Sequence, residues 1–311
     1  MDPYAAMTEG VALVDRSDSG KLALTGGEAK SFLNGQVSNE IEALEPGTGC
    51  YAALLTPKGK MLADLRVLDI GDELLLLCER SALQALFDAL RRFNIGFDAE
   101  LHKRTLERGL LSLIGPKADV ALGGQAPECH EHANVAAEIG GAPVRLVRTD
   151  VGIDVICDSA DTERVKAALL DSGAVEIDEA TADVLRVELG RPRYGVDLDD
   201  SVIPQEAGLN ERAVSFTKGC YVGQETVARL HYRGKPNRHL RGLRLREQVQ
   251  PGTELRLGER EVGRLTSVAA SPRFGPVGLA IVRREAQPGD VLDAGGVAAE
   301  VVALPFAQER G

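Results

Sequence analysis

The chain has 311 residues, of which 44% are hydrophobic and 27% are charged, a composition typical of folded rather than disordered proteins. This length is too great for one ordinary core, so two or three packed units are expected. The formal net charge of −11 argues against general nucleic-acid binding. No apolar run approaches the roughly 20 residues of a membrane span. Residues 1–18 lack the pattern of a secretory signal, and a cytoplasmic protein is therefore expected.

The first part of the chain alternates short strands with helices. Pro57-Lys58-Gly59 reads as a hairpin turn between two apolar runs. Thr25-x-x-Glu28 and Ser81-x-x-Gln84 have the spacing of a capping box, and each predicts the start of a helix. Strands are expected at 22–24, 50–56, 60–70, 73–78 and 110–114.

The pattern of apolar runs and turn residues changes after about residue 240. Before that point, we expect a hairpin of 144–148 with 153–157 and helices at 161–170 and 181–189. Beyond it, short apolar runs alternate with Gly and Pro-Gly turns, which is typical of a small all-β barrel. The sequence therefore predicts an α+β region through about residue 236, followed by a β-domain.

Five cysteines, at positions 50, 78, 129, 157 and 220, are an odd number and form no C-x-x-C pair. Neither a disulfide framework nor a zinc knuckle is indicated. Cys50, Cys78 and Cys157 lie in apolar, strand-like runs, where cysteine usually serves as a small buried hydrophobe. The cluster Cys129-His130-Glu131-His132 has no reinforcing partner motif, so we expect a solvated loop there and no metal site.

Nucleotide motifs are not found, since the chain has neither a G-x-G-x-x-G nor a Walker pattern. The segment 212–246 carries nine lysines and arginines against a single acid, Glu225. In an acidic chain, such a segment indicates either a site for an anionic ligand or a solvated basic face.

Two residues in the region 186–229 could carry chemistry. Glu188 lies near the end of an expected helix, and a carboxylate can accept two adjacent N–H donors such as those on the edge of a pterin ring. A surface glutamate is the alternative. Cys220 lies between Gly219 and Gly223, and the nearby ammonium of Lys218 favours a thiolate. Reactive and structural roles for this thiol both remain open.

The segment Lys218-Gly-Cys-Tyr-Val-Gly-Gln-Glu225 resembles the K-G-C-[FY]-x-G-Q-E signature of the YgfZ family, the folate-binding relatives of glycine-cleavage T-protein. The resemblance covers most of the chain. Its further motifs are Leu24-Thr25-Gly26, Phe32-Leu33-Asn34, Leu55-Thr56-Pro57-Lys58-Gly59-Lys60, Arg186-x-Glu188-x-Gly190, Tyr194-Gly195-x-Asp197 and Ile203-Pro204-x-Glu206.

The resemblance implies an α+β, three-lobed T-protein-like fold around a central folate channel, ending in a β-barrel. The expected domains are a discontinuous folate-binding domain (1–46 plus 141–236), an inserted α+β domain (47–140) and a C-terminal barrel (237–311). Tetrahydrofolate or a one-carbon-substituted folate is the implied cofactor. The residues implied to bind it are Glu188, Tyr194, Glu206 and Arg229, with Glu188 at the pterin.

The same resemblance implies a role in the assembly, maintenance or repair of iron–sulfur enzymes, with those enzymes or their assembly factors as partners. Cys220 is the implied functional thiol, with Lys218 and Asp64 as further catalytic candidates. The alternative is aminomethyltransfer, the T-protein reaction. T-proteins carry Gly-x-x-x-Asp-Asp-Leu where this chain has Ala63 before Asp64, and they lack the cysteine at 220. A folate-sensing module without chemistry is a third possibility.

Overall fold

The structure is a computed structural model that describes residues 2–307. It contains two compact units, and each is built from separate stretches of chain. Unit 1 comprises the residues up to Thr56, Leu62–Ala182 and Arg212–Val222. Unit 2 comprises Pro57–Met61, Asp183–Glu211 and the residues from Gly223 on.

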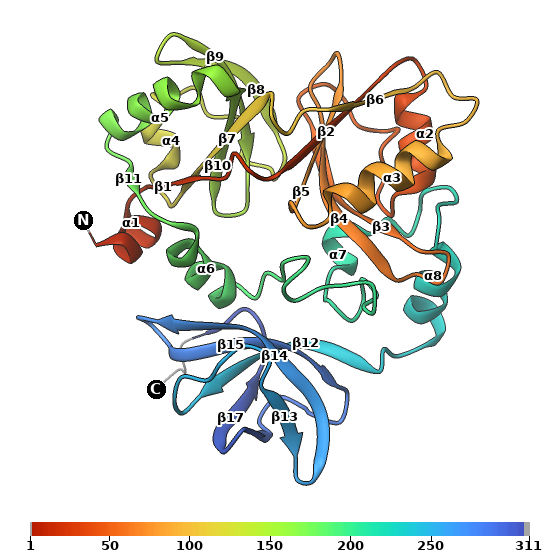
Figure 1. Cartoon of the computed structure of the whole chain (residues 1–311), viewed down its shortest axis with the longest axis vertical. Helices are drawn as coiled ribbons and strands as arrows, with labels where there is room; N and C mark the ends of the chain where they lie inside the picture. The colour runs from red at the N-terminus through yellow and green to blue at the C-terminus, as the bar shows by residue number, and fades with distance from the viewer. Residues whose placement is uncertain (1, 308–311) are drawn as a thin grey trace. The chain divides into compact units, whose positions relative to one another are not determined.

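Unit 1 contains two mostly antiparallel sheets (Figure 1). The six-stranded sheet has the order β11 (Val175–Glu176), β1 (Ala12–Asp15), β7 (Arg108–Ile114), β10 (Gly152–Asp158), β9 (Ala142–Arg148) and β8 (Asn134–Ile139). The five-stranded sheet has the order β3 (Gly49–Leu55), β4 (Met61–Asp69), β5 (Leu74–Cys78), β2 (Gly20–Thr25) and β6 (Glu100–Lys103).

Helices cover one face of each sheet. The six-stranded sheet has α1 (Pro3–Glu9), α4 (Ala118–Ala121), the 3-10 turn η1 (Ser159–Asp161) and α5 (Thr162–Asp171) beside it, and the five-stranded sheet has α2 (Ala29–Gln36) and α3 (Leu83–Phe93), as Figure 1 shows. Successive side chains of β10 point to opposite faces of the sheet. Val155 therefore packs in the core beneath α4 and α5, while Ile156 packs with Leu75 and Leu77 between the two sheets. The pleat therefore divides the side chains of β10 between two separate hydrophobic clusters.

Unit 2 is organised by a closed barrel. Its strand order is β12 (Arg238–Leu245), β15 (Gly275–Arg283), β14 (Arg260–Ser271), β13 (Glu254–Leu257), β16 (Val291–Ala294) and β17 (Val297–Val302). Leu243, Leu265 and Val301 belong to the apolar filling inside it. On the outer surface, Leu240 and Phe306 pack with Val187 of helix α6 (Glu179–Glu188). Helix α8 (Gln224–Arg233) also belongs to unit 2, and the short helix α7 (Asn210–Ala213) includes the boundary between the two units.

The expected α+β region followed by a β-barrel is confirmed, as is the hairpin of 144–148 with 153–157, which forms β9 and β10. Both predicted helices form, as α2 and α3, but neither begins at its predicted capping residue, Thr25 or Ser81. Helix α2 begins after Glu28 and α3 after Ala82, and neither N-cap side chain makes a capping hydrogen bond. Thr25 ends a strand instead, and its hydroxyl hydrogen-bonds to Nε2 of His102 at 2.8 Å. The three-domain division at 46, 140 and 236 stays a prediction.

No helix within residues 2–307 is long and apolar enough to cross a membrane.

Candidate functional site

The cysteine loop, defined here as Lys218–Val222, is anchored by its lysine. The Lys218 side chain is buried, and its Nζ donates to the carbonyl oxygens of Asn34 at 2.6 Å, Val37 at 3.0 Å and Asn39 at 2.6 Å. These carbonyls lie at and just beyond the C-terminal turn of α2, where backbone oxygens lack helical partners. All three ammonium hydrogens are thereby engaged. Burial lowers the pKa of Lys218 to about 8.

The other side of the loop is held by Tyr221, which is buried, with its ring centroid 5.4 Å from Nζ of Lys218. Burial raises the pKa of Tyr221 to about 12. Between these anchors Cys220 is exposed. Within residues 2–307, and apart from Gly219 itself and its two chain neighbours, no heavy atom lies within 4 Å of the place where a side chain at Gly219 would begin. The loop therefore presents its thiol to solvent from a fixed backbone.

Asp64, on β4, is buried and lies against Tyr51 of β3, whose hydroxyl donates to Oδ2 at 2.5 Å. Desolvation raises the pKa of Asp64. The pKa of Tyr51 is raised well above its ordinary value, first by desolvation and then by the charge of Asp64. Nδ2 of Asn39 donates to the carbonyl of Tyr51 at 2.8 Å. Since Asn39 also accepts from Lys218, two of the three predicted catalytic residues belong to one polar region of unit 1.

The segment Cys129–His132 does not behave as one solvated loop. Cys129 and His130 are exposed, as expected. Glu131, by contrast, forms an ion pair with Arg212, whose guanidinium lies 5.5 Å from the ring centroid of Tyr51. His132 is buried, and burial lowers its pKa to about 3, with Arg66 as the next cause. Among residues 2–307, no three His, Cys, Asp or Glu side chains are grouped so that they could hold a metal ion.

In unit 2, Glu188 is the last residue of α6 and is only 3% exposed. The surface alternative for this glutamate is therefore wrong. Its Oε1 accepts a hydrogen bond from the Ser271 hydroxyl at 2.5 Å. The Ser271 oxygen in turn accepts from the backbone N–H groups of Arg273 at 3.0 Å and Phe274 at 2.9 Å. The carboxylate is thus fixed in place by a serine that the backbone itself orients.

Glu206 is also buried, and it is bound by Arg238. Nε of Arg238 donates to Oε1 at 3.1 Å and Nη2 to Oε2 at 2.8 Å, the two-pronged geometry in which Arg–carboxylate pairs are strongest. Tyr194 is half-buried and forms an isolated bridge with Leu198. Arg229 is exposed on α8. The basic segment 212–246 is therefore neither a single ligand site nor a uniformly solvated face, because Arg238 forms an internal ion pair while Arg229 faces solvent.

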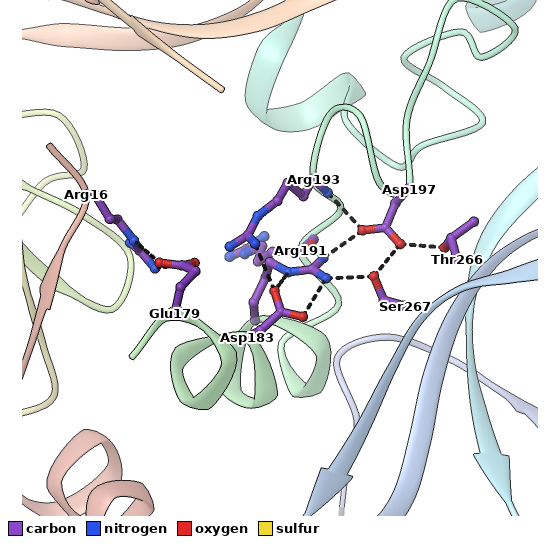
Figure 2. A network of polar contacts seen from close by, with 9 residues as sticks. Arg16, Glu179, Asp183, Arg191, Arg193, Asp197, Thr266 and Ser267 are labelled. Atoms are coloured by element: carbon purple, nitrogen blue, oxygen red, sulfur yellow. Dashed lines mark hydrogen bonds and ion pairs between the residues drawn. The ribbon is translucent and has the colours of Figure 1, made fainter. Parts of the chain in front are cut away.

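A carboxylate that the sequence does not single out as a site residue, Asp197, is the centre of the polar network in Figure 2. Its side chain is fully buried and accepts from Nη1 of Arg186 at 2.7 Å, from the Ser267 hydroxyl at 2.7 Å and from Thr266. The backbone N–H of Arg193 adds a fourth hydrogen bond at 3.0 Å. Asp197 thereby connects α6 and the segment that follows it to strand β14. The only signal in the sequence is its place in Tyr194-Gly195-x-Asp197.

Comparison with known proteins matches two family models to the chain. The GCVT N-terminal domain covers residues 2–218, and the glycine cleavage T-protein C-terminal barrel domain covers residues 238–308. An aminomethyltransferase from Streptomyces avermitilis is 31% identical over 98% of this chain and 88% of that protein. A chloroplastic protein of Arabidopsis thaliana, provisionally named as a transferase, is 27% identical over 90% of this chain and 67% of that protein.

Among solved structures, the crystal structure of the glycine cleavage system aminomethyltransferase T from Bartonella henselae is similar, with a TM-score of 0.88 and 24% identity. The match covers 99% of this chain and 89% of that one. At this level of identity it shows the fold, which is the T-protein-like α+β architecture with a C-terminal barrel that the sequence predicts.

Proposed function

Because the chain belongs to the glycine cleavage T-protein family, we propose that it is a cytoplasmic, folate-dependent, transferase-like protein that acts through Cys220 in the assembly, maintenance or repair of iron–sulfur enzymes. The observation that carries the proposal is the cysteine loop. Lys218 and Tyr221 are buried on either side of an exposed thiol, and this arrangement fixes the position of the thiol while leaving it accessible. A purely structural cysteine would instead be buried.

The ligand of this proposal is tetrahydrofolate or a one-carbon-substituted form, which supplies a carrier for a one-carbon unit. Glu188 fits the pterin edge, because it is a buried carboxylate held in one orientation by Ser271. Tyr194 and Glu206 would complete the contacts, with Glu206 acting through the guanidinium of Arg238. Arg229 is an exposed cation suited to a glutamyl carboxylate.

Calorimetry with tetrahydrofolate tests the ligand assignment. Glu188→Gln keeps the size of the side chain but removes the charge, and we expect affinity to fall about 10- to 100-fold, as for the loss of a charged hydrogen-bonding partner. Glu211→Gln, an exposed glutamate in unit 2, is the matched control and should bind like wild type. Wild-type affinity in Glu188→Gln rejects the assignment of the pterin contact.

Complementation of a deletion strain tests the thiol. We expect Cys220→Ser to leave the iron–sulfur enzyme activities depressed. Cys129→Ser changes a second exposed cysteine and should restore those activities. Full restoration by Cys220→Ser would reject a chemical role for Cys220, and together with intact folate binding it would favour the folate-sensing alternative.

Aminomethyltransfer remains the second candidate, because Asp64 is a buried carboxyl group with a raised pKa next to Tyr51. Formation of methylenetetrahydrofolate from the aminomethyl-loaded lipoyl carrier protein is the assay that separates the two. Turnover by wild type that is lost in Asp64→Asn but kept in Cys220→Ser would favour this reaction over the iron–sulfur role.

A further inference from the structure

Arg241 lies on the inner side of barrel strand β12. Side chains alternate along a strand, and Leu243 and Leu245 belong to the apolar filling of the barrel, so Arg241 shares their face. Its neighbour across the ladder on β15 is Ala280, another member of that filling. A cationic side chain therefore stands on the inner lining of the barrel, near the point where β12 begins.

The guanidinium of Arg241 is poorly satisfied by the protein. Nη1 donates to the carbonyl of its neighbour Leu240 at 3.1 Å, whereas Nε is buried and finds no hydrogen-bond partner in the described part of the chain. Burial lowers the pKa of Arg241, and among residues 2–307 no carboxylate offsets that effect. Burying a charge without a partner is costly, which makes this position unusual for a purely structural arginine.

Two glutamates near this end of the barrel are paired with other arginines. Glu206 is bound by Arg238, and Glu285 pairs with Arg260 at 3.1 Å. His239 lies on the same face of β12 as Arg241 and opposite Val282. Its pKa is lowered by burial first and by the Arg241 charge second, so its neutral ring can donate one hydrogen bond at pH 7.

We infer that Arg241 and His239 form a binding site for the oxyanion group of a small molecule, a carboxylate or a phosphate, at the end of the barrel. A guanidinium presents its N–H groups as a planar fork that matches two oxygens of such a group. A bound anion would give the exposed part of the guanidinium an acceptor and would offset a charge that the protein leaves without a carboxylate partner. Part of Arg241 remains exposed, so a ligand can reach it. The site does not depend on the folate proposal, since none of the residues assigned to folate above forms it.

The experiment follows the Arg241 Nε–H signal by ¹⁵N NMR while inorganic phosphate or glutarate is added to the full chain. We expect a saturable shift with at least one of the two probes, and the stronger probe identifies the oxyanion class. Arg241→Lys keeps the charge without the fork and should weaken binding by about 10-fold, as measured by the rise in Tm with probe concentration. Arg264→Met, an exposed arginine on β14, is the matched control and should respond like wild type.

The Arg241→Met variant provides a second, independent test of the site. Without any probe it should unfold at the same temperature as wild type or a higher one, since it removes an uncompensated charge from an apolar lining. With probe its Tm should stay unchanged. The inference is overturned if neither probe shifts the Arg241 signal, or if both probes raise the Tm of Arg241→Met and Arg264→Met as much as that of wild type.

Discussion

Tyr51 donates its hydroxyl hydrogen to Oδ2 of Asp64 at 2.5 Å inside unit 1. Desolvation is the first cause of the raised pKa of each group, and the hydrogen bond moderates the effect on Asp64 alone. The result is a carboxyl group that binds its proton more tightly in the folded chain than in the unfolded one. Such a group can serve as an acid, but its ionised form costs stability.

Asp64→Asn should therefore stabilise the protein at pH 7. The folded pKa of Asp64 lies above 3.8, so its proton stabilises the fold most below that value, and this contribution is lost as pH rises through the folded pKa. The amide keeps an acceptor for Tyr51 and removes the buried charge, for an expected gain of about 1 kcal/mol at pH 7. Urea unfolding at pH 7 and at about pH 4 measures both the gain and the loss of pH dependence. Lower stability of the variant at pH 7 would contradict this account.

Lys218→Met should destabilise the cysteine loop, because three carbonyl oxygens lose their donor. The expected loss is about 2–4 kcal/mol near neutral pH. Between the folded pKa of about 8 and the ordinary value of 10.5, the unfolded chain binds more protons, so stability gains from Lys218 as pH rises across that window. Denaturant unfolding at both ends of the window should show this gain in wild type and not in the methionine variant. An equal slope in both proteins would exclude Lys218 as its source.

Asp197→Ala should be among the most damaging substitutions in unit 2. It removes the buried one of two carboxylates that pair with Arg186, the other being Asp183 at 2.6 Å, and it removes the acceptor of two hydroxyls, for an expected loss of about 2–4 kcal/mol. Asp200→Ala, an exposed neighbour, should stay within about 0.5 kcal/mol of wild type. Thermal unfolding of the three proteins decides the matter, and similar values for the two variants would mean that the network in Figure 2 contributes little.

Alkylation by iodoacetamide at pH 8 should label Cys129 and Cys220 first, since both are exposed. Cys78 and Cys157 are buried, as their strand context predicts, and Cys50 is half-buried. Burial raises the pKa of Cys50 and of Cys78 to about 12, so each carries very little of the reactive thiolate. Peptide mass spectrometry of a time course measures the order. Early labelling of Cys50 would show that the burial seen here is not maintained in solution.

The barrel could be predicted from sequence, because period-two alternation and frequent Gly turns are local signals that do not depend on contacts with distant parts of the chain. The cysteine loop is equally visible, since its residues are contiguous. Thr25-x-x-Glu28 shows where local spacing fails: it matches a capping box, yet the hydroxyl of Thr25 bonds to His102, 77 residues away.

In the candidate site, too, single residues could be predicted from sequence but their distant partners could not. Glu188 and Glu206 are identifiable as candidates, but no pattern in the sequence shows that Ser271 binds the first and Arg238 the second. Likewise, the sequence places Glu131 in a solvated loop, whereas in the structure it forms an ion pair with Arg212. Partners this far apart in sequence are chosen by the packing of sheets and barrel, which no short spacing encodes.

The Pro57–Met61 turn belongs to unit 2, and the Met61 N–H donates to the carbonyl of Val202 at 2.9 Å. On a ribosome that adds about 5–20 residues per second, this turn would wait roughly 7–30 s for its partners to emerge. The neighbouring contact of Lys60 with Ser201 spans the same 141 residues. Folding of unit 2 during synthesis therefore cannot proceed strictly from the N-terminus, and a nascent chain stalled before residue 202 should leave this turn open to chaperones and proteases.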